Sequence, residues 1–186
     1  MAERSEWEKM LSGEKYKAAT PEFWDKLDRT KNLCQKYNNL KGTDVESRGK
    51  MIRQILGKTG ERVKVEQPFY CDYGCNIRVG EDFFSNFSLT ILDEALVTIG
   101  DNCFIGPNVS LYTACHPLDP AERNEGIEWA EPITIGNSVW IGGSVTICPG
   151  VTIGDNCVIG AGSVVVKDIP ANSVAVGNPA RVVKSI

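Results

Sequence analysis

Residues 135–170 read IGNSVW, IGGSVT, ICPGVT, IGDNCV, IGAGSV and VVKDIP, and residues 99–116 read IGDNCF, IGPNVS and LYTACH. Both stretches carry an aliphatic residue at every sixth position, usually followed by glycine, with Cys, Val or Ser four places after the aliphatic residue. A period of six fits neither the 3.6-residue period of a helix nor the simple alternation of a single strand. Because one such repeat cannot bury its own apolar side, the pattern predicts a solenoid whose turns stack around a continuous core.

This repeat resembles that of the hexapeptide-repeat family. The resemblance implies a mainly β fold, a left-handed parallel β-helix of triangular section in which three hexads make one coil. It also implies that the aliphatic residue and the small residue four places later point inward, whereas the sixth residue points outward. Two residues at sixth positions are unusual, because His116 closes LYTACH and Trp140 closes IGNSVW.

Composition limits the classes of function. The chain has 186 residues, 42% of them hydrophobic, and a formal net charge of −4 at pH 7. This favours one substantial core with a small appendage, and the scattered basic residues give no expectation of nucleic-acid binding. Since no run reaches about 18 apolar residues and the first residues lack an apolar leader, we expect no membrane span and a cytoplasmic protein.

The cysteines and the single histidine bear on metal and disulfide chemistry. Seven cysteines without a secretory signal indicate free thiols. Cys103, Cys115 and Cys157 fall at inward positions of their hexads, where a thiol is a compact filler. Cys71 and Cys75 are spaced too widely for the common CxxC pattern, so we expect no bound metal.

Residues 1–60 differ from the repeat and predict a helical segment before a β-helix over residues 61–186. Ser5 with Glu8 and Thr43 with Glu46 have the spacing of capping boxes, and three helices are expected. From Val79 to Ile99 the rhythm takes 20 residues instead of 18, which predicts a bulge or corner insertion near residues 92–97. The middle helix carries one apolar stripe, which consists of Phe23, Leu27, Thr30, Cys34 and Tyr37.

Residues 112–132 interrupt the rhythm and are typical of a surface loop that leaves the solenoid wall. His116 stands where this loop departs, which favours a catalytic base over a structural histidine, since imidazole titrates near neutrality. Cys115 is the rival as a covalent nucleophile, and its expected inward position counts against it. Glu128 and Glu131 in the loop are candidates for the residue that orients the imidazole.

Longer stretches carry a closer resemblance. MLSGEKYKAATPEF (10–23), YCDYGCNIRVGEDFFSNF (70–87), TIGDNCFIGPNVSLYTACHPLD (98–119) and GNPARVVK (177–184), with the hexads between them, resemble the maltose and galactoside O-acetyltransferases over essentially the whole chain. This implies transfer of the acetyl group of acetyl-CoA to a sugar hydroxyl. It also implies a homotrimer with active sites between subunits.

The resemblance assigns residues to the acceptor side. His116 is the general base that removes the proton of the attacking hydroxyl, and Asn86 orients the acceptor unless it is only a residue of a coil corner. Asp72, Asp93 and Glu94 fall near the acceptor pocket.

On the coenzyme side, the resemblance places the pantetheine arm of the coenzyme over Trp140, although a trimer contact is an alternative cover. A backbone N–H at the Gly142-Gly143 pair is expected to stabilise the oxyanion of the tetrahedral intermediate. The full set of expected coenzyme-binding residues is Trp140, Gly143, Ala161, Val166, Lys167, Arg181 and Lys184.

Other functions stay open. At Ala18 and Leu27 the chain departs from the acidic residue and the arginine that galactoside enzymes present to the sugar, so the acceptor is undecided. Hexapeptide-repeat enzymes that acetylate antibiotics are one alternative to a sugar O-acetyltransferase, and a trimeric sugar-binding scaffold without catalysis is another. Release of free CoA thiol in the presence of a panel of sugars separates these alternatives.

Overall fold

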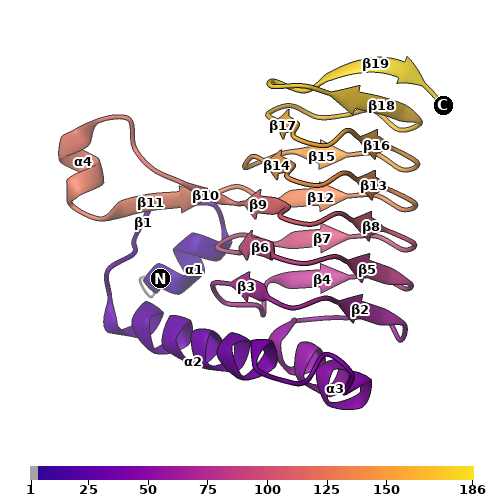
Figure 1. The fold of residues 1–186 in the computed structure, drawn as a ribbon. Helices are drawn as coiled ribbons and strands as arrows, with labels where there is room; N and C mark the ends of the chain where they lie inside the picture. The colour runs from indigo at the N-terminus through magenta and orange to yellow at the C-terminus, as the bar shows by residue number, and fades with distance from the viewer. Residues whose placement is uncertain (1–3) are drawn as a thin grey trace.

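A computed structural model describes residues 4–186, as a column of stacked β coils with helices across its N-terminal end (Figure 1). Three sheets form the walls of the column, and successive strands pass from sheet I to sheet II to sheet III. Sheet I contains β4 (Ile77–Val79), β7 (Val97–Ile99), β12 (Ile133–Ile135) and β15 (Thr152–Ile153). Sheet II contains β2 (Val63–Val65), β5 (Phe83–Ser85), β8 (Phe104–Ile105), β13 (Trp140–Ile141), β16 (Val158–Ile159), β18 (Ser173–Val176) and β19 (Arg181–Ser185). Sheet III contains β3 (Phe69–Cys71), β6 (Leu89–Leu92), β9 (Ser110–Tyr112), β14 (Thr146–Ile147) and β17 (Val164–Val165).

The hexad positions point as predicted. Each aliphatic first position lies in the core, and the small residues Cys103, Val139 and Cys157 four places later are also buried. All neighbouring strands of the coils pair in parallel, except that β19 folds back antiparallel on β18 at the C-terminal end (Figure 1). The apolar residues therefore form one continuous column, and the outward side chains distinguish one wall from another.

The early coils are longer than the later ones. Val79 pairs with Ile99 and Phe69 pairs with Leu89, so the predicted two-residue insertion is confirmed. The extra residues form the corner between sheet III and sheet I, where residues 93–96 leave the ladder.

The described part of the N-terminal segment contains three helices, namely α1 (Glu6–Leu11), α2 (Pro21–Asn38) and α3 (Val45–Ile55). The capping box of Ser5 and Glu8 is present, but that of Thr43 and Glu46 was wrong. The N-cap of α3 is Asp44 and not Thr43, the residue before it. The carboxylate of Asp44 accepts the N–H of Ser47 at 3.0 Å, and aspartate caps a helix at least as well as threonine does. The stripe of α2 is buried except at Leu27, which is half-buried.

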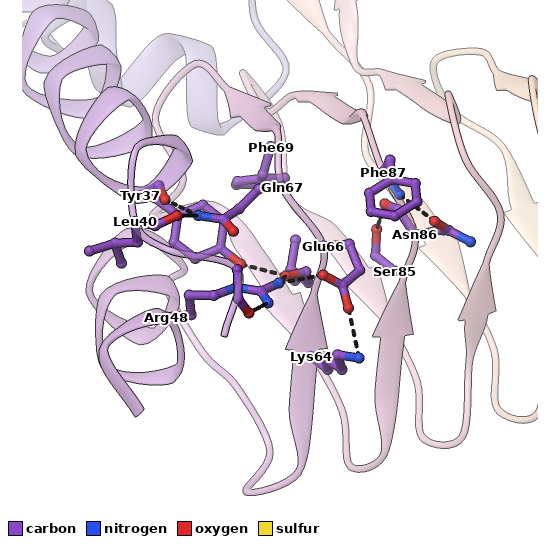
Figure 2. Close-up of polar contacts among 12 residues, drawn as sticks. Tyr37, Leu40, Arg48, Lys64, Glu66, Gln67, Phe69, Ser85, Asn86 and Phe87 are labelled. Atoms are coloured by element: carbon purple, nitrogen blue, oxygen red, sulfur yellow. Dashed lines mark hydrogen bonds and ion pairs between the residues drawn. The ribbon is translucent and has the colours of Figure 1, made fainter. Parts of the chain in front are cut away.

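A buried polar network joins these helices to the first coil (Figure 2). Arg48 of α3 donates to the Val65 carbonyl at 2.7 Å and to Glu66 at 2.6 Å. Tyr37 of α2 donates its hydroxyl to the same carbonyl, and Gln67 donates to the carbonyl oxygens of Tyr37 and Leu40. The helices therefore close the open end of the column through specific hydrogen bonds as well as apolar contact.

The interruption at residues 112–132 has its own secondary structure. It contains β10 (Ala114–Cys115), α4 (Pro120–Asn124) and β11 (Ile127–Ala130), and it projects from the middle of the column as an arm (Figure 1). β11 pairs antiparallel with β10 on one side and with β1 (Tyr16–Lys17) on the other. The three short strands make a small sheet, which we call the arm sheet, and it joins the N-terminal segment to the arm.

Within residues 4–186, none of the helices combines the length and the apolar character that crossing a bilayer requires.

Candidate active site

The imidazole of His116 is exposed. It follows β10 at the base of the arm, and 54% of its side-chain surface is accessible. Its Nδ1 lies 3.6 Å from Oε1 of Glu128 on β11. Glu131, the other candidate partner, instead accepts the indole N–H of Trp129 at 3.2 Å. The geometry therefore favours Glu128 as the carboxylate that faces the imidazole.

The position predicted for Cys115 was wrong. Because β10 leaves the column to pair with β11, Cys115 lies half-buried in the arm sheet instead of pointing into the core. Burial raises the pKa of its thiol to about 11. Since the thiolate is the nucleophilic form, a covalent role for this cysteine near neutral pH is disfavoured.

A groove of about 500 Å³ runs over the outer face of sheet II. Its floor includes Trp140, of which 59% is exposed, and Phe104 and Phe84, which stand beside it in the parallel register. Phe104 was not among the predicted site residues, although its sequence position could have indicated it. It closes IGDNCF at the same outward hexad position as Trp140. The residues around the groove are Phe84, Asn86, Phe104, Ile105, Gly106, Pro107, Trp140, Gly142, Gly143, Val158, Ile159, Gly160 and Ala161.

Asn86 lies at one end of this groove, in the corner after β5. Its N–H donates to the Ile105 carbonyl at 2.8 Å, as the N–H of Gly106 donates to Ile141 in the next coil. Asn86 thus occupies the coil position that later coils fill with glycine. Its Oδ1 accepts the N–H of Phe87 at 2.8 Å, and its amide nitrogen points away from that backbone (Figure 2).

Gly143 lies in the equivalent corner after β13. The glycine before it, Gly142, is required by packing, since a Cβ there would lie 2.6 Å from the nitrogen of Ala161. Among residues 4–186 the N–H of Gly143 has no protein acceptor. Ala161 lies directly above it in the next coil, and its methyl side chain carries no acceptor group. This corner therefore presents an open backbone donor to the groove.

The remaining predicted coenzyme residues lie outside the groove. Arg181 and Lys184 are exposed on β19, at the C-terminal end of the same sheet. Val166 and Lys167 are exposed and follow β17, at the edge of sheet III. Positive charge is thus available beyond the C-terminal end of the groove.

Asp93 has a structural role that the sequence did not predict. It is 0% exposed, and its carboxylate accepts the N–H groups of Asp72, Tyr73 and Asn76 at 2.8–3.3 Å. Burial raises its pKa to about 7 despite these donors. Because no part of this carboxylate is accessible, Asp93 holds the corner of the coil and does not contact an acceptor.

Glu94 and Asp72 lie together at the same corner. Burial and the side-chain contact with Asp72 raise the pKa of Glu94 to about 9. Glu94 also accepts the hydroxyl of Thr113 at 3.3 Å, three residues before His116. Glu94 therefore contacts the segment that leads into the arm and to His116.

Comparison with known proteins decides the family. A model described as the maltose acetyltransferase hexapeptide capping motif matches residues 9–60, and one described as bacterial transferase hexapeptide (six repeats) matches residues 132–167. The galactoside O-acetyltransferase of Escherichia coli is 46% identical over 162 residues, which cover 87% of this chain and 80% of that protein. The crystal structure of a maltose O-acetyltransferase from Clostridium difficile superposes with a TM-score of 0.97 at 51% identity, over 98% of both chains. The chain belongs to the maltose and galactoside O-acetyltransferase family.

A second solved structure extends this result. A galactoside acetyltransferase in complex with coenzyme A matches with a TM-score of 0.95 and 45% identity, over 99% of this chain and 92% of that one. The left-handed parallel β-helix implied by the resemblance to the hexapeptide-repeat family is confirmed, and this member of the family is an acetyl-CoA-dependent O-acetyltransferase. Among residues 4–186, no three His, Cys, Asp or Glu side chains are grouped so as to hold a metal ion.

Within the chain of this acetyltransferase, the imidazole of His116 does not line the groove. His116 is absent from the lining of the groove, and its arm leaves the column from β9 of sheet III, whereas the groove lies on sheet II. In Figure 1 the arm extends away from the side on which β8, β13 and β16 are labelled. The chain therefore presents the exposed imidazole at one place and the groove at another.

Proposed function

We propose that this acetyltransferase transfers the acetyl group of acetyl-CoA to a hydroxyl group of a small sugar, with His116 as general base, in a site between two subunits of a homotrimer. The observation that carries the proposal is the separation of the exposed imidazole from the groove on sheet II. Around a threefold axis, one face of each subunit meets a different face of the next, so every groove acquires a neighbour's imidazole. The names of the relatives, which act on maltose and galactosides, support the sugar acceptor.

The reaction is direct attack in a ternary complex. His116 takes the proton of the acceptor hydroxyl as its oxygen attacks the thioester carbonyl carbon. The oxygen of the tetrahedral intermediate accepts a hydrogen bond from the open N–H of Gly143. As the intermediate collapses, the carbon–sulfur bond breaks, the acetyl group remains on the acceptor oxygen, and the imidazolium returns its proton to the CoA thiolate.

Other residues position the two substrates. Trp140 supports the pantetheine arm, while Arg181 and Lys184 at the end of sheet II face the phosphates of the nucleotide. Asn86 and the Asp72–Glu94 pair contact the acceptor through hydrogen bonds. The raised pKa of the Cys115 thiol disfavours an acyl-enzyme on that residue.

The test is release of CoA thiol from acetyl-CoA with maltose, glucose and galactosides as acceptors. We expect release with at least one sugar, and His116→Ala lowers kcat by about 10²–10⁴ because the proton acceptor is lost. Cys115→Ala is the matched control and keeps the rate. If His116→Ala retains more than about a tenth of the rate, the base assignment is wrong. If no sugar releases thiol, the acceptor assignment is wrong, and a response to antibiotics alone supports the xenobiotic alternative.

A further inference from the structure

The arm sheet places three side chains in one row across its strands. In the pairing of β1 with β11, Tyr16 stands opposite Glu128. In the antiparallel pairing of β10 with β11, Cys115 stands opposite Trp129. The same register continued by one residue places His116 opposite Glu128. Residues opposite each other in an antiparallel pair project to the same face. Tyr16, Glu128 and His116 thus follow one another on one face of the arm sheet.

Contacts join the members of this row. The hydroxyl of Tyr16 donates to Oε2 of Glu128 at 2.9 Å, and the other carboxylate oxygen lies 3.6 Å from Nδ1 of His116. Tyr16 is only 2% exposed, and its ring packs against that of Phe23 with a centroid distance of 5.4 Å. Burial and the charge of Glu128 raise the pKa of the Tyr16 hydroxyl, which therefore remains a donor. The buried Tyr16 of the N-terminal segment therefore fixes the carboxylate of Glu128 on the side away from His116.

We propose that Tyr16 and Glu128 are positioning residues that hold His116 in the tautomer with its proton on Nδ1. This inference rests on the proposed role of His116 as a base. A carboxylate beside Nδ1 stabilises a proton there and leaves the Nε2 lone pair free for the acceptor hydroxyl. The 3.6 Å separation is longer than a hydrogen bond and shortens when the substrate complex forms, as is common for catalytic contacts.

The tautomer matters because only the unprotonated nitrogen can take a proton. If Nε2 carries the hydrogen, it faces the acceptor hydroxyl as a donor and the base is lost. In the serine protease triad, loss of the orienting carboxylate costs about 10⁴-fold in kcat. At the more exposed His116 we expect a smaller loss, about 10- to 100-fold.

The experiment uses the single histidine of the chain, which gives one set of imidazole signals. The nitrogen chemical shifts of ¹⁵N-histidine-labelled enzyme, measured well above pH 7, report which nitrogen is protonated. We expect the Nδ1–H form in the wild type, and a shift toward the Nε2–H form in Glu128→Leu and, by a smaller amount, in Tyr16→Phe. Glu131→Leu on the same arm and Tyr70→Phe at an exposed tyrosine are the matched controls, and both keep the wild-type shifts.

Kinetics provide the second readout. Glu128→Leu is expected to lower kcat about 10- to 100-fold and Tyr16→Phe about 3- to 10-fold, with the KM for acetyl-CoA unchanged, because neither residue touches the groove. Tyr16→Phe keeps the packed ring, so it remains informative if Glu128→Leu fails to fold. Wild-type nitrogen shifts in Tyr16→Phe and in folded Glu128→Leu would overturn the inference. If the tautomer shifts in Glu128→Leu and Tyr16→Phe but His116→Ala remains active, Tyr16 and Glu128 do position the imidazole, and His116 is not the base.

Discussion

Two corners flank sheet II in each coil, and they differ in how the backbone N–H groups are hydrogen-bonded. In the corner from sheet I to sheet II, the N–H at the third hexad position donates to the side chain one coil above. Glu81 donates to Asp101 at 2.7 Å, Asp101 to Asn137 at 2.9 Å and Asn137 to Asp155 at 2.6 Å. In the corner from sheet II to sheet III, the equivalent N–H of Gly143 lies below Ala161 and has no protein acceptor among residues 4–186.

This difference suits the two corners of one coil to different roles, one in holding the coils together and the other in binding a ligand. The backbone of the two corners is alike, since a glycine at the second hexad position lets the coils approach closely in both. The side chain at the third position decides the rest. An Asp or Asn closes the ladder of donors on one side of sheet II, whereas the small residues on the other side leave a donor and space for a ligand. The open corner is the place where the coenzyme thioester is proposed to bind.

The sharpest way to break this comparison is Ala161→Asp, which gives the open corner the acceptor that the closed corner has. The new carboxylate would accept the N–H of Gly143, as Asp155 accepts that of Asn137. We expect kcat to fall about 100-fold, because one oxyanion donor is lost and a negative charge stands near the developing oxyanion. Initial rates at saturating acetyl-CoA measure the effect.

Ala161→Gly is the matched variant, because it changes the same residue without adding an acceptor. It should keep the rate within about 3-fold. Equal rates for Ala161→Asp and the wild type would show that the N–H of Gly143 takes no part in the reaction.

A second prediction concerns the outward face beside the open corner. Trp140→Ala removes an aromatic side chain from the floor of the groove. If the coenzyme covers this ring, the lost apolar contact raises the KM for acetyl-CoA about 10-fold, which corresponds to about 1.4 kcal/mol. Val176→Ala, an exposed residue of the same sheet outside the groove, is the control and leaves this KM unchanged. An unchanged KM together with dissociation in analytical ultracentrifugation would mean that a neighbouring subunit, not the coenzyme, covers Trp140.

The column was predictable from the sequence because its information is local and repeated. The same six-residue pattern recurs in each coil, so the core positions and the outward exposure of Trp140 followed from the hexads together with the family resemblance. The apolar stripe of α2 followed from helical spacing in the same way. The prediction for Cys115 was wrong because the hexad register was extended into a strand that had already left the column.

The site was less predictable because it depends on pairings between distant residues. No spacing rule connects Tyr16 with Glu128, which meet only because β1 adds to the edge of β11. The structural role of Asp93 could not be predicted from the sequence for a similar reason. The three backbone N–H groups that donate to its carboxylate belong to another coil. The family resemblance named His116 and the groove residues and implied sites between subunits, but the sequence did not show where the imidazole and the groove lie on one chain.

The smallest expected effect comes from the reverse change, Asp155→Ala, which opens the closed corner. It removes the acceptor of the Asn137 N–H and a contact of 3.2 Å to the Asn137 side chain, which in turn accepts from Asp101. Because these groups are exposed and water replaces the lost acceptor, the free energy of unfolding should fall by only about 1 kcal/mol, measured by urea denaturation at fixed protein concentration. The kcat should stay unchanged, since this corner holds no substrate. A fall in kcat comparable to that of Ala161→Asp would mean that the corners are coupled through the coil, and the division between a closed structural corner and an open chemical one would fail.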